Sequence, residues 1–69
     1  MKIEVRGSTE KLRRLQSVLE SRFKGVEFCT GFVDLLIVEV FSTVSDCDRV
    51  KDFIDAYCVG AGTVWQMSQ

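Results

Sequence analysis

The sequence predicts an α+β fold of the ferredoxin-like type, βαββαβ, in which a four-stranded antiparallel sheet of order 4-1-3-2 carries two helices on one face. The first observation is an apolar run in the middle of the chain, residues 32–41 (FVDLLIVEVF), which is too short to span a membrane and indicates a central strand. The second is the order of the flanking patterns: strand, helix and strand before this run, helix and strand after it. Right-handed crossovers then place the first and third strands at the centre of the sheet. We expect a single domain, residues 1–69.

The first strand and the first helix follow from the spacing of their apolar residues. Residues 2–6 alternate between apolar and polar side chains, as expected of a strand with one solvated face. Ser8 can cap a helix that runs to about Lys24, where Gly25 supplies a left-handed stop. The stripe that this helix turns toward the sheet consists of Leu12, Leu15, Leu19 and Phe23.

A second strand is predicted just before the central one. Residues 26–30 alternate again, and a turn near Gly31 should join this strand to the central strand as an antiparallel hairpin. The apolar run then stops at Ser42 and Thr43, which bound the central strand on its other side. The two strands should therefore be neighbours in the sheet.

A second helix and a last strand complete the pattern. Ser45 and Asp48 form a capping box, so the helix is predicted to start near residue 46, and Gly60 is predicted to end it. Residues 63–67 then predict a short final strand. The inner stripe of the second helix consists of Cys47, Val50, Phe53, Ile54, Tyr57 and Cys58.

The charge of Glu39 decides which side of the central strand faces the helices. A carboxylate beneath the helices would lose its hydration, so Glu39 is expected on the open face of the sheet. Because side chains alternate along a strand, the inward set is then Leu36, Val38 and Val40, and the outward set is Val33, Leu35, Ile37, Glu39 and Phe41. The core is predicted to contain Leu15, Leu19, Phe23, Val38, Val40, Val50, Phe53 and Ile54. The outward set is more apolar than a solvated face requires, which predicts an interaction surface.

The composition bounds the class of protein. A chain of 69 residues buries only about 60% of the surface that its unfolded form exposes, so a partner or a second copy is an expected source of stability. The three cysteines are odd in number and include no Cys-x-x-Cys pair, and the chain has no histidine, so no disulfide framework, metal or cofactor is expected. These thiols, and the absence of a signal-peptide pattern after Met1, predict a cytoplasmic protein.

The net charge of −1 conceals a division along the chain. The first 24 residues carry seven basic and three acidic side chains, whereas the rest carries two basic and seven acidic ones. On the first helix, Lys11, Arg14 and Arg22 surround Val18 and form a second candidate contact site. Basic side chains also commonly line the edge of a core with their aliphatic stems, so this pattern has a purely structural reading as well.

Two functions that this fold can support lack their residues here. The RNA recognition motif needs aromatic side chains on the first and third strands, but the first strand presents Glu4 and the central strand presents Leu35 and Ile37. An enzyme of the acyl- or phosphoryl-transfer classes needs a histidine triad or a glycine-rich loop before a helix, and the sequence has neither. We therefore expect no enzymatic activity.

Three functional hypotheses remain open. The first is a small intracellular protein-interaction module, such as an accessory or inhibitory protein of a mobile element, which binds a protein partner or itself as a homodimer through the open sheet face. The second is a regulatory dimer that binds a small metabolite, as ACT-like domains do, with the turn from the first strand to the first helix as its site. The third is a nucleic-acid binder that uses the basic flank of the first helix, Lys11, Arg13, Arg14 and Arg22.

Overall fold

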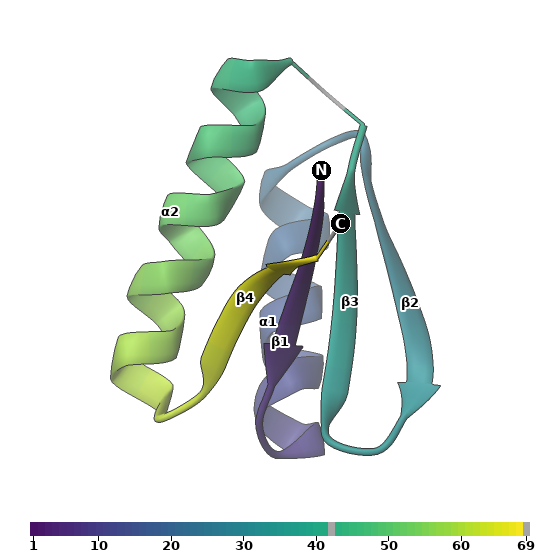
Figure 1. The fold of residues 1–69 in the computed structure, drawn as a ribbon, viewed down its shortest axis with the longest axis vertical. Helices are drawn as coiled ribbons and strands as arrows, with labels where there is room; N and C mark the ends of the chain where they lie inside the picture. The colour runs from purple at the N-terminus through teal and green to yellow at the C-terminus, as the bar shows by residue number, and fades with distance from the viewer. Residues whose placement is uncertain (42, 69) are drawn as a thin grey trace.

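The computed structural model describes residues 1–41 and 43–68, without the side chain of Ser68, and its elements follow the predicted order (Figure 1). The sheet has the order β2-β3-β1-β4, and every neighbouring pair of strands is antiparallel. This is the predicted ferredoxin-like α+β fold. The elements are β1 (Lys2–Arg6), α1 (Thr9–Arg22), β2 (Val26–Phe32), β3 (Leu35–Val40), α2 (Val44–Ala61) and β4 (Val64–Ser68).

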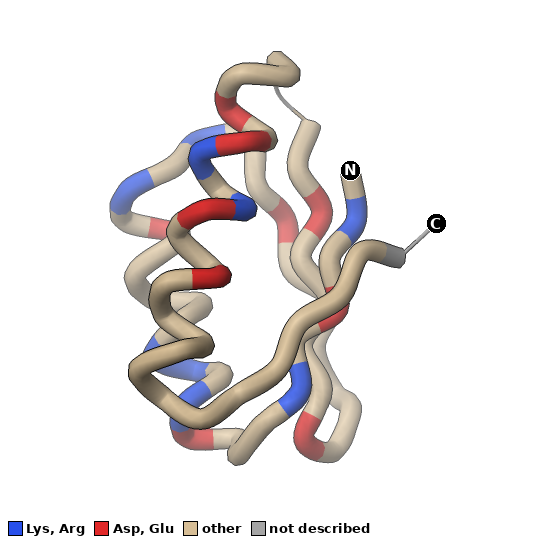
Figure 2. Tube along the Cα trace, turned by 60° about the vertical axis from the view of Figure 1, so that its left-hand side comes forward, with Lys and Arg blue, Asp and Glu red and all other residues tan. Residues whose placement is uncertain are grey.

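Two layers make up the molecule, with both helices on one side of the sheet, as the side view in Figure 2 shows. The core lies between the layers and consists of Ile3, Val5, Leu12, Leu15, Leu19, Leu36, Val38, Val40, Val50, Ile54 and Cys58. The radius of gyration, 10.7 Å, is close to the value of about 11 Å expected for one compact domain of this length. One helix layer therefore covers one face of the sheet and leaves the other open.

Alternation along β3 confirms the predicted faces of the central strand. Leu36, Val38 and Val40 are at most 3% exposed beneath the helices, whereas Leu35, Ile37 and Glu39 are only half-buried. Six of the eight residues predicted for the core are buried: Leu15, Leu19, Val38, Val40, Val50 and Ile54. The carboxylate of Glu39 thus fixed the side of β3 that faces the helices.

Phe23 and Phe53 are half-buried and pack against the core from its edge, so their predicted place in the core is only partly correct. Their ring centroids are 6.1 Å apart in an edge-to-face arrangement. The guanidinium of Arg22 lies 5.2 Å from the centroid of the Phe53 ring and covers part of it. The two rings therefore close one end of the core rather than fill its centre.

The hairpin between β2 and β3 turns later than predicted. β2 continues to Phe32, the turn is formed by Val33 and Asp34, and Asp34 takes the left-handed conformation with φ 56°. Gly31, which the sequence marks as the turn, lies inside β2 with φ 96°. The register between β2 and β3 shifts between Cys29 and Phe32, which marks a β-bulge. Glycine adopts positive φ without strain, so Gly31 allows this bulge.

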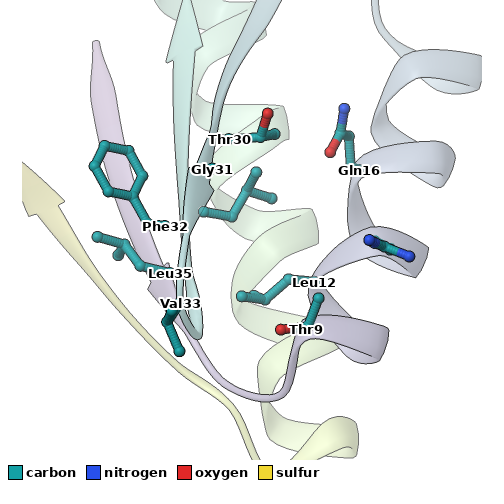
Figure 3. A pocket seen from close by; sticks show the side chains of 10 residues that line it. Thr9, Leu12, Gln16, Thr30, Gly31, Phe32, Val33 and Leu35 are labelled. Atoms are coloured by element: carbon teal, nitrogen blue, oxygen red, sulfur yellow. The ribbon is translucent and has the colours of Figure 1, made fainter.

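This bulge changes the face on which Phe32 lies. Val26 and Phe28 pair with the inward residues of β3, and strict alternation from Phe28 would turn Phe32 toward the helices as well. Instead Phe32 pairs with Leu35 and lies with it on the open side of the sheet (Figure 3). One extra residue in β2 is sufficient for this exchange of faces.

The ends of both helices differ from the prediction. α2 starts at Val44 because Thr43, and not Ser45, is its N-cap, with the Thr43 hydroxyl accepting a hydrogen bond of 3.3 Å from the amide of Asp46. Its C-cap is Gly62, with φ 70°, rather than Gly60. α1 ends at Arg22 with Phe23 as an extended C-cap. Ser42, predicted as part of the break after the central strand, lies outside the described residues.

Candidate functional site

The open face of the sheet is the surface that the sequence marks for function, and the strand register orders it into rows. Side chains that pair across neighbouring strands lie on the same face. The row nearest the β2–β3 turn consists of Phe32, Leu35, Arg6 and Val64; the middle row of Cys29, Ile37, Glu4 and Gln66; and the far row of Glu27, Glu39 and Lys2.

Apolar side chains gather at the turn end of this face. Phe32 is 49% exposed, Val64 is 67% exposed, and Val33 at the tip of the turn is 87% exposed. Leu35 and Ile37 on β3 are half-buried, and Arg6 on β1 lies between Leu35 and Val64. We call the five apolar residues the hairpin-end patch. Such a grouping of large apolar side chains on a small protein is typical of an interaction site.

Charged side chains run along β1 on the open face, from Arg6 in the turn row through Glu4 in the middle row, and also occupy the far row with Lys2 and Glu39. Lys2 Nζ lies 3.9 Å from a carboxylate oxygen of Glu39, and Arg6 lies 3.6 Å from Glu4. Glu27 stands directly opposite Glu39 across the β2–β3 ladder, where two like charges repel. Because these ion pairs are exposed, they contribute little to stability. They give the apolar patch a polar border with both signs of charge.

The structure brings together only part of the predicted outward set. Leu35, Ile37 and Glu39 share the open face, and Val33 adjoins them from the turn. Phe41 follows the end of β3 and is 63% exposed at the other end of the molecule from the turn. The predicted apolar strip therefore does not continue to Phe41: on β3 it consists of Leu35 and Ile37, and Glu39 follows them.

Sequence reasoning missed Phe32 and Val64 as members of this surface. Phe32 was assigned to the central strand, and only the bulge places it on the open face of β2. Val64 joins the same row because it pairs with Arg6 at the edge of the sheet. The signal that could have found Phe32 is Gly31, since an isolated glycine within a strand pattern often marks a bulge.

The predicted basic site on α1 is engaged by the chain itself. Arg14 donates to Glu10 at 2.9 Å, Lys11 donates to the carbonyl oxygen of Ala61, and Arg22 covers the Phe53 ring. Lys11, Arg14 and Arg22 do lie along one side of α1, but that side adjoins α2. These contacts are compatible with the structural reading, but the three side chains are exposed, so the contact site on α1 stays a prediction.

The charge division of the sequence becomes a division between neighbouring helices. α1 carries four basic and two acidic residues, whereas α2 carries two basic and four acidic ones (Figure 2). The hydroxyl of Tyr57 on α2 donates a 2.8 Å hydrogen bond to the carbonyl oxygen of Lys11, and Trp65 Nε1 on β4 donates to Asp55 at 3.0 Å. Opposite charges thus lie within one helix layer and not on two separate faces.

In the turn from β1 to α1, where the alternative hypothesis predicts a metabolite site, the space beside Gly7 is filled by the chain. A Cβ atom at Gly7 would lie 2.3 Å from Cγ2 of Thr63, so the two residues are in tight contact. The Gly7 amide donates to the carbonyl oxygen of Asp34 at 3.2 Å. The β1–α1 turn therefore packs against Thr63, which precedes β4, and against the β2–β3 turn at Asp34.

The thiols of Cys29 and Cys58 lie in opposite environments. Cys29 is exposed on the open face, whereas Cys58 is 4% exposed in the core. Burial raises the pKa of the Cys58 thiol from its ordinary value of 9.0, the Asp55 carboxylate acts in the same direction, and the Thr63 hydroxyl opposes them. Because the thiolate is the reactive form, Cys58 should be inert in the folded protein.

In a dilute solution of single chains, we expect iodoacetamide at pH 8 to modify Cys29 rapidly and Cys58 only when the protein opens, since burial makes Cys58 inaccessible and raises the pKa of its thiol. Peptide mapping by mass spectrometry as a function of time measures both rates. Cys29→Ser should remove the fast phase and leave the slow one. Equal rates at the two thiols would contradict the described packing of α2.

Three further observations bear on the class of protein. Within residues 1–41 and 43–68, no group of three or more histidine, cysteine or acidic side chains is placed to hold a metal ion. Neither of the described helices is long and apolar enough to cross a membrane. No protein-family model, curated protein or solved structure matches the chain. The fold itself defines a small α+β protein with ferredoxin-like topology.

Proposed function

We propose that this chain is a protein-interaction module rather than an enzyme, and that it forms a homodimer through the open face of its sheet. The observation that carries the proposal is the hairpin-end patch, Phe32, Val33, Leu35, Ile37 and Val64, on the face that the helices leave uncovered. Apolar surface removed from water contributes about 25 cal/mol per Å², and a small domain with a marginal core gains most from it.

A second copy is the occupant that the open face fits most simply. A two-fold axis needs only one self-complementary surface, and sheets commonly pack face to face. The open face carries both signs of charge beside its apolar patch, with Lys2 and Arg6 on β1 and Glu39 on β3. A two-fold axis can therefore place the basic strand of one copy against the acidic groups of the other.

The test is the oligomeric state of matched aspartate variants. We expect sedimentation equilibrium to give a dimer for the unmodified chain and a folded monomer for Ile37→Asp, because the new carboxylate would be buried between the copies. Val59→Asp is the control, since Val59 on α2 is 81% exposed and lies in the helix layer, away from the open face. It should remain a dimer.

Two results would overturn the proposal. The first is an unmodified chain that remains monomeric at about millimolar concentration, the weak end of specific association. The second is an Ile37→Asp variant that stays dimeric while Val59→Asp dissociates, which would move the interface to the helix layer. The proposal also places the protein in the reducing cytoplasm, where an exposed thiol such as Cys29 persists on the interface without oxidation.

A further inference from the structure

A cleft of about 490 Å³ lies between the first half of α1 and the β2–β3 hairpin, on the helix side of the sheet. Figure 3 shows Thr30 of β2 and Gln16 of α1 facing each other across it, with Leu12 and Thr9 nearer the start of α1. Small-molecule sites typically have volumes of about 300–1,000 Å³. The cleft has the size of a ligand site. It shares Phe32, Val33 and Leu35 with the hairpin-end patch, but its wall on α1 lies outside the proposed dimer surface.

The lining of this cleft combines an apolar base with a few polar groups. Phe32 and Val33 of the hairpin, 49% and 87% exposed, supply accessible apolar surface, and the core residues Leu12 and Leu36 close the base. The hydroxyls of Thr9 and Thr30 and the amide of Gln16 supply hydrogen-bonding groups along the walls. A ligand with an apolar body and one polar end matches this distribution.

Arg13 determines the charge of the ligand. It is the one charged residue among those that line the cleft, and none of the lining residues is acidic. Its neighbours Lys11, Arg14 and Arg22 are engaged within the chain, but in the part of the chain that the structure describes Arg13 makes no ion pair. Its guanidinium is therefore available to an anion that enters the cleft.

We propose that the cleft binds a small organic monocarboxylate, with the carboxylate on Arg13 and the apolar body between the hairpin side chains Phe32 and Val33 and the base formed by Leu12 and Leu36. The planar fork of arginine matches the two oxygens of a carboxylate, and this charge-assisted pair is stronger than a neutral hydrogen bond. A single cation in the lining balances one negative charge, and the apolar base excludes a ligand that is polar throughout. Thr9 and Thr30 can donate further hydrogen bonds to the same head group.

The test uses octanoate as the probe, with 1-octanol and octylammonium as neutral and cationic counterparts of the same length. We expect octanoate to give saturable shifts of the Thr9, Gln16 and Thr30 amides in ¹⁵N-¹H correlation spectra, and each counterpart to bind at least about tenfold more weakly. Arg13→Gln should weaken octanoate binding by about tenfold or more. Lys24→Gln, the same loss of charge beyond the other end of α1, should leave it unchanged.

The proposal is overturned if 1-octanol binds as tightly as octanoate, or if Arg13→Gln binds octanoate as tightly as the unmodified chain does. It is also overturned if the amide shifts centre on Ile37 of the open face, or if no saturable shift appears up to about 10 mM octanoate. The dispersion of the same spectra shows whether each variant is folded. Repeating the titration on Ile37→Asp separates this site from the proposed dimer. Octanoate should bind this variant at least as tightly as it binds the unmodified chain, because a dimer would cover Phe32, Val33 and Leu35 of the cleft.

Discussion

Val38→Asp should unfold the protein, whereas Ile37→Asp, one residue away on the same strand, should leave it folded. Val38 is fully buried at the centre of β3, paired with Ile3 of β1 on one side and Phe28 of β2 on the other. An aspartate there loses the apolar contacts of valine, about 1.5–3 kcal/mol, and adds a buried carboxyl group that costs several kcal/mol more. Small domains have only about 5–15 kcal/mol of total stability.

Ile37 gives the matched control because the same substitution there changes the other face of the sheet. It is half-buried on the open face between Cys29 and Glu4, where a carboxylate keeps access to water. Circular dichroism in the far ultraviolet and urea titration measure the two variants. A folded Val38→Asp together with an unfolded Ile37→Asp would show that the two faces of β3 had been exchanged, a slip of one residue in register.

Gly7→Ala should destabilise the protein by about 1–3 kcal/mol because the β1–α1 turn has no room for a side chain. The new Cβ would lie 2.3 Å from Cγ2 and 3.1 Å from Cβ of Thr63. Thr63 cannot yield easily, since it is 7% exposed and its β-branched side chain has few rotamers. Urea titration should show the loss as a lower midpoint without a change of slope.

A second substitution tests the cause of this loss. Thr63→Ser removes Cγ2, so the double variant Gly7→Ala with Thr63→Ser should be more stable than the sum of the two single effects, by about 0.5–3 kcal/mol. Gly60→Ala is the control, because a Cβ atom at Gly60 on α2 meets nothing within 4 Å and alanine favours the helix. Strictly additive effects at Gly7 and Thr63 would exclude the contact as the cause.

The sequence by itself determined the type and order of the elements and the side of the central strand that faces the helices. Helix and strand periods are local patterns that identify each element, although the bulge in β2 interrupts the alternation of that strand. Glu39 then fixed the inward side of β3, because burying its carboxylate would cost more than any packing gain from the alternative register. Right-handed crossovers supplied the strand order, which is the order observed.

Ends of elements were predicted less well because neighbouring signals compete. Thr43 with Asp46 and Ser45 with Asp48 are equivalent Ser/Thr-x-x-Asp patterns, and the structure uses the first. Gly60 and Gly62 compete at the other end of α2 in the same way. Local sequence cannot decide which of two nearby capping residues ends a helix. The difference in free energy between the two ends depends on how α2 packs against β4 and α1.

Only the tertiary structure decided where the surfaces of this protein lie. The bulge at Gly31 moves Phe32 to the open face, and Gly7 meets Thr63 across almost the whole length of the chain. Arg14 pairs with Glu10, four residues earlier on α1, which is a local contact, whereas Arg13 borders a cleft that only the distant β2–β3 hairpin completes. Such features depend on contacts between residues distant in sequence, and local periodicity carries no information about those contacts.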